Sequence, residues 1–217
     1  MILKAEVIAD YIKRGEKPQT KDPLVISPSL DPAKFATSGS ASIDLRLGTW
    51  FVKLRQARVA AIRFKADVSQ SQLPEPQIIE THYVPFGDEY YLHPQAFMLG
   101  ITLEWIRLPG NLAAYVIGKS SLGRRGLIIA TATGVHPGFK GCLTLELGNL
   151  GETPIAITPG MKVCQIFLHE VRTLNRDLVD QSQFGGSRKP RLGEVRLEDD
   201  EIAYKLANAR RGGRTSQ

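Results

Sequence analysis

The chain has 217 residues, 42% of them hydrophobic, which is most economically one domain with a hydrophobic core. Its net charge of +6 fits a polyphosphate ligand as well as nucleic acid, so charge alone does not decide between these partners. No apolar stretch approaches the ~18 residues of a membrane span, and the N-terminal residues lack the apolar run of a signal peptide. We therefore expect a cytoplasmic protein without a membrane partner.

The first half of the chain opens with a helical pattern. Apolar residues recur at helical spacing over residues 2–14, which predicts one amphipathic helix ending before Gly15. A proline-containing loop follows, with a short strand predicted at 24–26. In SASIDLRLG at 40–48, the apolar residues alternate with Asp44 and Arg46, which predicts a strand. We expect those two charges to form an ion pair rather than to contact a ligand directly.

The second half of the chain has the rhythm of a β protein. Residues 56–90 contain Gln, Ser and Pro around SQSQLPEPQ and are expected to form an exposed excursion between strands. From Tyr90 onward, short apolar segments alternate with turn signals, without a βαβ rhythm or an internal repeat. This pattern predicts an all-β barrel or sandwich. Cys142 and Cys164 lie in apolar runs without metal-ligand spacing, so we expect both to be reduced core residues.

A cluster of hydroxyls and cations follows the predicted strand that ends at Gly118. Ser120 and Ser121 are suitable N-cap residues for a short helical turn, whose free N–H groups favour an anion. Lys119 and two arginines add positive charge within the same segment. A P-loop is excluded because the residues before Gly118 are strand formers instead of a glycine-rich loop. The segment therefore predicts a phosphate-binding turn.

A lone carboxylate lies on the predicted strand at 143–147. Leu143, Leu145 and Leu147 alternate with Thr144 and Glu146, which puts the two polar side chains on the same face. A phosphate-binding turn followed by a carboxylate on a rigid strand suits a phosphorylated ligand whose other end undergoes proton transfer. A paired, purely structural carboxylate is the alternative interpretation of Glu146.

Five segments of this chain, in the same order, resemble the dCTP deaminase family of the dUTPase-like superfamily: SASIDLRLG at 40–48, YLHPQAFMLGITLEWIRLP at 91–109, GKSSLGRRGL at 118–127, PGFKGCLTLEL at 137–147 and PGMKVCQIF at 159–167. The resemblance implies a dUTPase-like distorted β-barrel or jelly-roll with a few short helices. It places a deaminase domain at 1–193. Residues 194–217 are then a basic extension, which we expect to be helical. The resemblance also implies a homotrimer with shared active sites.

The resemblance implies roles for individual residues. The glutamate of LTLEL, here Glu146, is the catalytic residue. The GKSSLGR segment and further positions bind the substrate; in this chain they are Lys119, Ser120, Ser121, Arg124, Thr133, His136, Phe184, Ser187 and Arg188. Three of these depart from the family pattern, because His136 replaces an aspartate, Phe184 a tyrosine and Ser187 a glutamine. Arg188 and Lys189 can supply compensating contacts to phosphate.

The implied activity is hydrolytic deamination of dCTP to dUTP and ammonia. The HxE and PCxxC signatures of the zinc deaminases are absent from the sequence, so the implied mechanism is zinc-independent, with magnesium carried by the triphosphate. Two alternatives remain open. The first is a dUTPase, or a bifunctional dCTP deaminase and dUTP diphosphatase giving dUMP. The second is a catalytically silent nucleotide-binding regulator. Nucleic acid is the less favoured partner.

Overall fold

The computed structural model describes residues 1–54, 79–130, 134–172 and 185–193. The chain divides into two compact units, of which the first comprises Met1–Leu54 and Glu80–Leu192. The second, Arg55–Ile79 with Gly193–Gln217, falls almost entirely outside the described residues. The predicted central excursion is therefore described only from residue 79 onward, and the predicted helix at 194–217 is not described. All that follows concerns the first unit together with Ile79 and Gly193.

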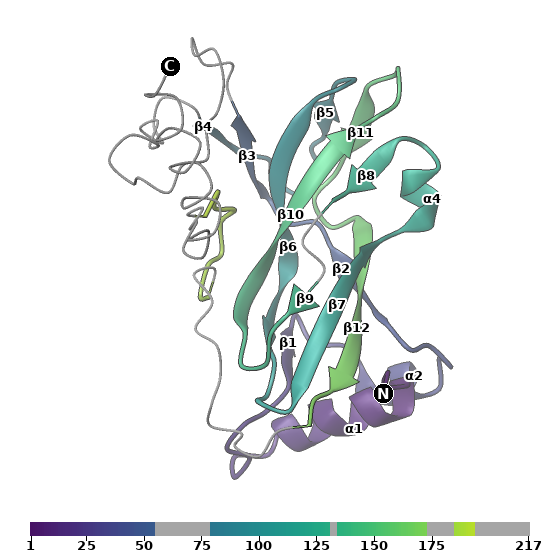
Figure 1. Cartoon of the computed structure of the whole chain (residues 1–217), viewed down its shortest axis with the longest axis vertical. Coiled ribbons are helices and arrows are strands. Elements are labelled where there is room, and N and C mark those ends of the chain that lie inside the picture. The colour runs from purple at the N-terminus through teal and green to yellow at the C-terminus, as the bar shows by residue number, and fades with distance from the viewer. Residues whose placement is uncertain (55–78, 131–133, 173–184, 194–217) are drawn as a thin grey trace, which may run out of the picture. The chain divides into compact units, whose positions relative to one another are not determined.

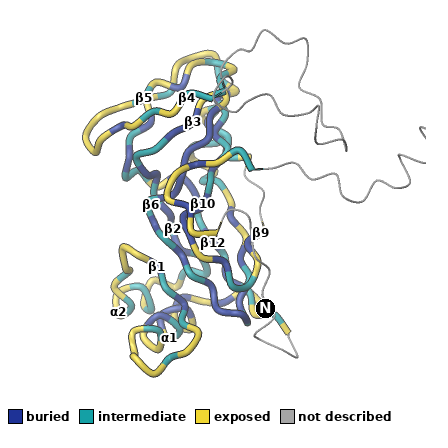
Figure 2. The backbone as a smooth tube through the Cα atoms, turned by 90° about the vertical axis from the view of Figure 1, so that its left-hand side faces the viewer, coloured by how far each residue is buried: buried dark blue, intermediate teal, exposed yellow. Residues whose placement is uncertain are grey.

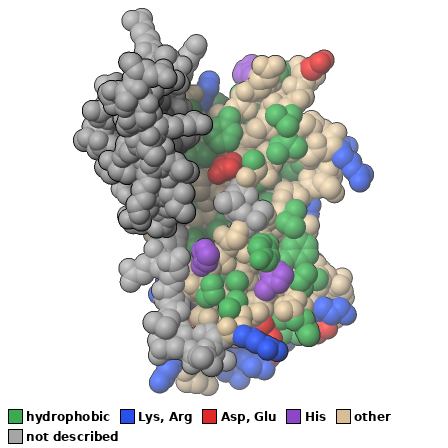
Figure 3. Space-filling model, viewed as in Figure 1, with side chains coloured by type: hydrophobic (Ala, Val, Ile, Leu, Met, Phe, Trp, Pro, Cys, Tyr) green, Lys and Arg blue, Asp and Glu red, His purple; other side chains and the backbone are tan. Residues whose placement is uncertain are grey.

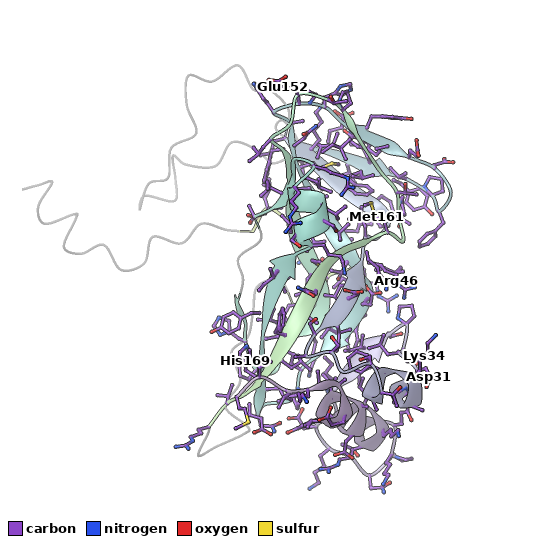
Figure 4. All side chains as sticks on the ribbon, turned by 90° about the vertical axis from the view of Figure 1, so that its right-hand side faces the viewer. Asp31, Lys34, Arg46, Glu152, Met161 and His169 are labelled. Carbon is purple, nitrogen blue, oxygen red and sulfur yellow. The ribbon has the colours of Figure 1, made fainter. Side chains whose placement is uncertain are left out.

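The helices of the described residues are short. They are α1 (Ala5–Gly15), α2 (Pro32–Ala36) and α4 (Ser120–Gly123), and none is long and apolar enough to cross a membrane. The predicted helix at 2–14 is confirmed, but it begins later because the first residues are extended: Leu3 donates a backbone hydrogen bond to Leu168 at 2.9 Å. Helix α2 begins at an Asp31 N-cap, whose carboxylate accepts from the amides of Ala33 and Lys34 (Figure 4).

Strands dominate the structure, so the predicted all-β class with a few short helices is confirmed (Figure 1). One sheet has the order β4-β3-β6-β10-β8, with β1 also paired to β6; a second has the order β2-β12-β7-β9; and β11 pairs with β5. The strands of the described residues are β1 (Val25–Ser27), β2 (Ile43–Arg46), β3 (Trp50–Leu54), β4 (Ile79–Tyr83), β5 (Tyr90–Leu92), β6 (Phe97–Arg107), β7 (Leu112–Gly118), β8 (Leu127–Ile129), β9 (Gly134–Val135), β10 (Lys140–Asn149), β11 (Ile155–Ile157) and β12 (Lys162–Glu170).

A single hydrophobic core receives side chains from all three sheets and from α1. Figure 2 shows buried residues concentrated along β2, β6, β10 and β12. Cys142 and Cys164 belong to these buried strands, as expected, and both are free thiols. Burial raises the pKa of the Cys164 thiol to about 12 and also raises the pKa of Cys142. Neither thiol is therefore ionised near neutral pH.

Strand β6 connects the two larger sheets. Between Ile101 and Trp105 it bulges away from β10, because four steps along β6 match only two steps along β10. At this bulge, β6 turns toward the other sheet: Leu47 pairs with Thr102, and the amide of Gly48 donates to the Ile101 carbonyl at 2.7 Å. The bulge thereby ties β2 to the sheet that carries β10.

Candidate functional site

Strand β10 carries the predicted carboxylate. Leu145 and Leu147 are fully buried, whereas Thr144 and Glu146 are half-buried on the opposite face, which confirms the predicted alternation. On one side Glu146 lies opposite Leu99 of β6, and on the other its carbonyl accepts a hydrogen bond from the Ala130 amide at 2.9 Å. The backbone of Glu146 is therefore held from both sides. The strand is therefore a rigid support for the side chain that it carries.

A buried polar network lies beside β10 at the β6 bulge. The hydroxyl of Thr102 accepts from the Leu143 amide at 2.9 Å and donates to the Glu104 carbonyl at 2.9 Å. The Glu104 carboxylate, only 3% exposed as a residue, accepts from the backbone amide and the Nε of Arg46 at 2.8 and 2.6 Å. Sequence reasoning missed this network. The sequence did contain a sign of it, because Thr102 and Glu104 are two polar residues on the same face of an otherwise apolar strand.

The predicted phosphate-binding turn is α4, which follows directly after β7 (Figure 1). The predicted capping is wrong: Lys119 is the N-cap, and it makes no side-chain capping bond, whereas Ser120 and Ser121 are the first residues of the helix. Both serines are exposed at the surface. Arg124 is exposed at the end of the turn, and its neighbour Arg125 donates to the Ser121 carbonyl at 2.8 Å.

An ionic cluster lies beside the start of α4. The Lys119 ammonium is 2.5 Å from one carboxylate oxygen of Asp44, and the Lys162 ammonium is 3.1 Å from the other. Partial burial opposes ionisation of Asp44, but the hydrogen bonds and charges of the two lysines outweigh it, so the pKa of Asp44 lies below its ordinary value. The prediction that Asp44 pairs with Arg46 is wrong, since Arg46 pairs with Glu104. Figure 4 places Arg46 on β2, with Met161, the residue before β12, just above it.

Asn149 orders the loop that lies against the far end of the turn. Its side chain is fully buried and donates to the carbonyls of Leu92 and Thr153, each at 2.9 Å, while its oxygen accepts from the Gly151 amide at 2.8 Å. Gly126, at the end of the turn, has a φ of +91°, and a Cβ there would lie 2.8 Å from the Gly151 nitrogen. Only glycine fits this close approach. Sequence reasoning did not single out Asn149 either.

The turn and the carboxylate lie at opposite ends of β8. This strand begins shortly after α4, and Ala130, directly after it, bonds to Glu146. At about 3.3 Å per strand residue, Leu127 and Ala130 are ~10 Å apart. An elongated ligand, with an anionic end and a reactive end, is the kind that could contact both features.

The remaining predicted substrate-binding residues are distributed as follows. His136 is exposed, and its carbonyl accepts from the Phe139 amide at 3.2 Å in a turn where Gly138 has a φ of +80°. Ser187 is buried, and its hydroxyl donates to the Lys189 carbonyl at 2.6 Å. Arg188, beside it, is exposed. Thr133 and Phe184 lie outside the described residues.

The segment that carries Ser187 is attached to the start of β10. The Cys142 amide donates to the Ser187 carbonyl at 3.1 Å, and the Lys189 ammonium lies 3.9 Å from the centre of the Trp50 ring. Within the described ranges, no group of three or more His, Cys, Asp or Glu side chains is arranged to hold a metal ion.

Comparisons with known proteins agree with this picture. A family model described as dCTP deaminase-like matches residues 2–171. A dUMP-forming dCTP deaminase of Dictyoglomus thermophilum is 38% identical over 172 residues, which cover 79% of this chain and 81% of the relative. A dCTP deaminase of Haloarcula marismortui is 39% identical over 166 residues, covering 76% and 80% of the two chains.

Among solved structures, the 2'-deoxycytidine 5'-triphosphate deaminase of Agrobacterium tumefaciens superimposes with a TM-score of 0.52 at 20% identity. The match covers 77% of this chain and 46% of that chain, so this protein spans less than half the length of that solved relative. At this level of identity, the likeness shows a shared fold.

Proposed function

Because this chain belongs to the dCTP deaminase-like family, we propose that it hydrolyses dCTP to dUTP and ammonia, with Glu146 as the group that moves protons. The observation that carries this proposal is the Glu146 side chain, which lies on the half-buried face of a strand held on both sides. Glutamate is a residue of the type that general acid–base catalysis needs, and here its support is rigid.

The chemistry that we propose for Glu146 moves two protons of one water molecule. The carboxylate takes the first proton as the water oxygen attacks C4 of the cytosine, and gives it to the ring nitrogen N3. It then takes the proton of the new C4 hydroxyl and gives it to the C4 amine, which leaves as ammonia as the C4 carbonyl forms. One molecule of water is consumed, and no electron is transferred. A single carboxylate can serve both steps because it returns to its starting state.

We assign the triphosphate to the α4 turn. Ser120 and Ser121 expose hydroxyls that can donate to phosphate oxygens, and Arg124 exposes a guanidinium whose paired donors match two of those oxygens. Magnesium would arrive with the triphosphate, since this ion favours phosphate oxygens and water over an all-protein cage. His136, Ser187 and Arg188, with Thr133 and Phe184, remain proposed substrate contacts.

A second candidate product is dUMP, because the Dictyoglomus thermophilum relative is named dUMP-forming. That reaction needs a base that activates water for attack on the α-phosphate. At the position where the family resemblance expects an aspartate, this chain has His136. The carboxylate that would take a proton from that water is therefore missing at this position. We therefore propose dUTP as the product.

We propose a homotrimer as the working form, and the outer face of β7 supports an assembly. Tyr115 and Ile117 are each 48% exposed there, and the His169 ring lies edge-on to Tyr115 at 4.8 Å between centres. Hydrophobic side chains gather on this face of the molecule (Figure 3). Adjacent exposed apolar side chains are typical of protein interfaces. Light scattering on the purified protein measures its mass directly.

We also propose a cytoplasmic location, where deoxynucleotides are available.

One assay distinguishes the candidate activities. Purified protein is mixed with magnesium and either dCTP or dUTP, and ammonia and pyrophosphate are followed separately. Equal amounts of ammonia and dUTP without pyrophosphate support the proposal. Ammonia with pyrophosphate indicates a bifunctional enzyme. Pyrophosphate from dUTP alone indicates a dUTPase, and dCTP binding without either product indicates a silent regulator.

A further inference from the structure

The start of the α4 turn is attached to the sheet by a side chain as well as by the backbone. The Lys119 amide donates to the Val163 carbonyl of β12 at 3.0 Å, and its ammonium reaches Asp44 of β2 at 2.5 Å. Asp44 is separated from Lys119 by 75 positions in the chain. Strand β12 lies between β2 and β7, so the Lys119 side chain extends across it. Three elements therefore meet at this ion pair.

The ion pair is shielded enough to hold its geometry. The side chains of Lys119 and Asp44 are 29% and 31% exposed, whereas that of Lys162, the second partner of Asp44, is 62% exposed. Both oxygens of the carboxylate are thus occupied by cations, and the more shielded of the two belongs to the turn. Partly buried pairs are screened less by salt than exposed ones.

The two ends of the turn are held differently. At the far end, the Leu150 amide donates to the Gly126 carbonyl at 2.9 Å, beside the buried Asn149 side chain. At the near end, the side-chain attachment is the pair of Lys119 with Asp44. The serines and Arg124 lie between these two attachments. Loosening the near end would therefore displace the exposed hydroxyls and the guanidinium together.

We propose that Asp44 is a positioning residue, which holds Lys119 and through it the α4 turn, and that Lys119 does not contact phosphate. This inference rests on the proposed function, in which α4 binds the triphosphate. It reverses the role that the family resemblance implies for Lys119. The Asp44 carboxylate offsets the charge of the Lys119 ammonium that it pairs with, whereas Arg124 is exposed at the end of the same turn.

The two roles of Lys119 predict opposite results for Asp44→Asn. If Lys119 contacted phosphate, removal of the Asp44 charge would free its ammonium, and the KM for dCTP would fall. If Asp44 positions the turn, the KM rises on the order of 10-fold or more, because small displacements of binding groups are costly. In both cases kcat is set elsewhere, at Glu146, and stays near its wild-type value.

The experiment compares Asp44→Asn, Lys119→Met and the double variant with the wild type. Positioning predicts that each single variant raises KM and that the double variant is no worse than the more affected single variant, because both changes remove the pair of Lys119 with Asp44. A lower or unchanged KM in Asp44→Asn, or additive losses in the double variant, would overturn the proposal. Asp22→Asn is the control, since Asp22, like Asp44, pairs with a cation, here Arg107, and lies away from α4.

A second measurement does not depend on the enzyme's activity. The amides of Leu122, Gly123 and Arg124 donate within the turn at 2.9, 3.1 and 3.0 Å. Positioning predicts faster hydrogen exchange at these amides in Asp44→Asn and in Lys119→Met, but not in Asp22→Asn. Unchanged exchange in either Asp44→Asn or Lys119→Met would overturn the inference. If one of these variants fails to fold, the other still supplies the test. If the wild type binds no dCTP, the proposed function fails, while the exchange data still decide the role of Asp44.

Discussion

The backbone amide of Leu143 donates to the side-chain hydroxyl of Thr102, 2.9 Å away, where the pairing of β10 with β6 shifts register. At a bulge, the ladder cannot supply a backbone acceptor for every amide. The Thr102 hydroxyl takes that place beneath the strand that carries Glu146. This hydrogen bond keeps β10 attached to β6 at the position where β6 bulges.

Replacing Thr102 by valine removes this acceptor while keeping the shape of the side chain. The buried Leu143 amide is then unsatisfied, which should lower the free energy of unfolding by about 1–3 kcal/mol. Urea denaturation measures this loss. Thr102→Ser keeps the hydroxyl and should cost clearly less. Equal costs for the valine and serine variants would mean that the hydroxyl does not stabilise the bulge.

Glu146→Gln should bind dCTP as the wild type does but release ammonia ~10²–10⁴-fold more slowly, because an amide cannot shuttle protons. Calorimetry measures the binding, and ammonia release measures the turnover. Glu152→Gln is the control, since Glu152 is an exposed carboxylate just after β10 (Figure 4). Near-wild-type ammonia release by Glu146→Gln would exclude the proposed mechanism.

Arg124→Ala should raise the dissociation constant for dCTP by roughly 10–100-fold, the usual value of hydrogen bonds between charged groups. Arg124→Lys should restore only part of this affinity, because an ammonium lacks the paired donors of a guanidinium. Arg14→Ala, which removes an exposed charge from α1, controls for the change in net charge. Tight dCTP binding by Arg124→Ala would place the triphosphate elsewhere.

Deamination should occur without release of pyrophosphate, so that dUTP accumulates and added dUTP persists. The reason is His136, which stands where the family resemblance expects the carboxylate base for that step. A coupled pyrophosphate assay, run with dCTP and with dUTP, measures this. Stoichiometric pyrophosphate from either nucleotide would show that His136 or another group acts as that base.

The ion pair of Asp44 should make stability depend on pH in acid. The pKa of Asp44 is lowered in the folded protein, so its contribution is complete above the unfolded value of about 3.9 and is lost as the pH falls through the folded value. The difference in unfolding free energy between wild type and Asp44→Asn should thus be constant from pH 5 to 7 and shrink below ~4. Urea titrations at each pH measure it, and a difference at pH 3 as large as that at pH 6 would contradict the pairing.

The sequence by itself determined the features that depend on a few neighbouring residues. The alternation of Leu143, Leu145 and Leu147 with Glu146 indicated a strand and its two faces, because side chains alternate along any extended chain. In the same way, the strand ending at Gly118 and the helical turn after it followed from local apolar and hydroxyl residues. The all-β class followed from many such short segments.

Only the tertiary structure decided which polar groups meet. Asp44 and Arg46, two positions apart, were expected to pair with each other, yet Asp44 pairs with Lys119 and Arg46 with the buried Glu104. Those partners are 75 and 58 positions away, and strand order and the β6 bulge bring them together. The energy of an ion pair depends on distance in space and on burial, neither of which a local pattern contains. For the same reason the buried Asn149, one of whose partners is Leu92, 57 positions away, was recognised only in the fold.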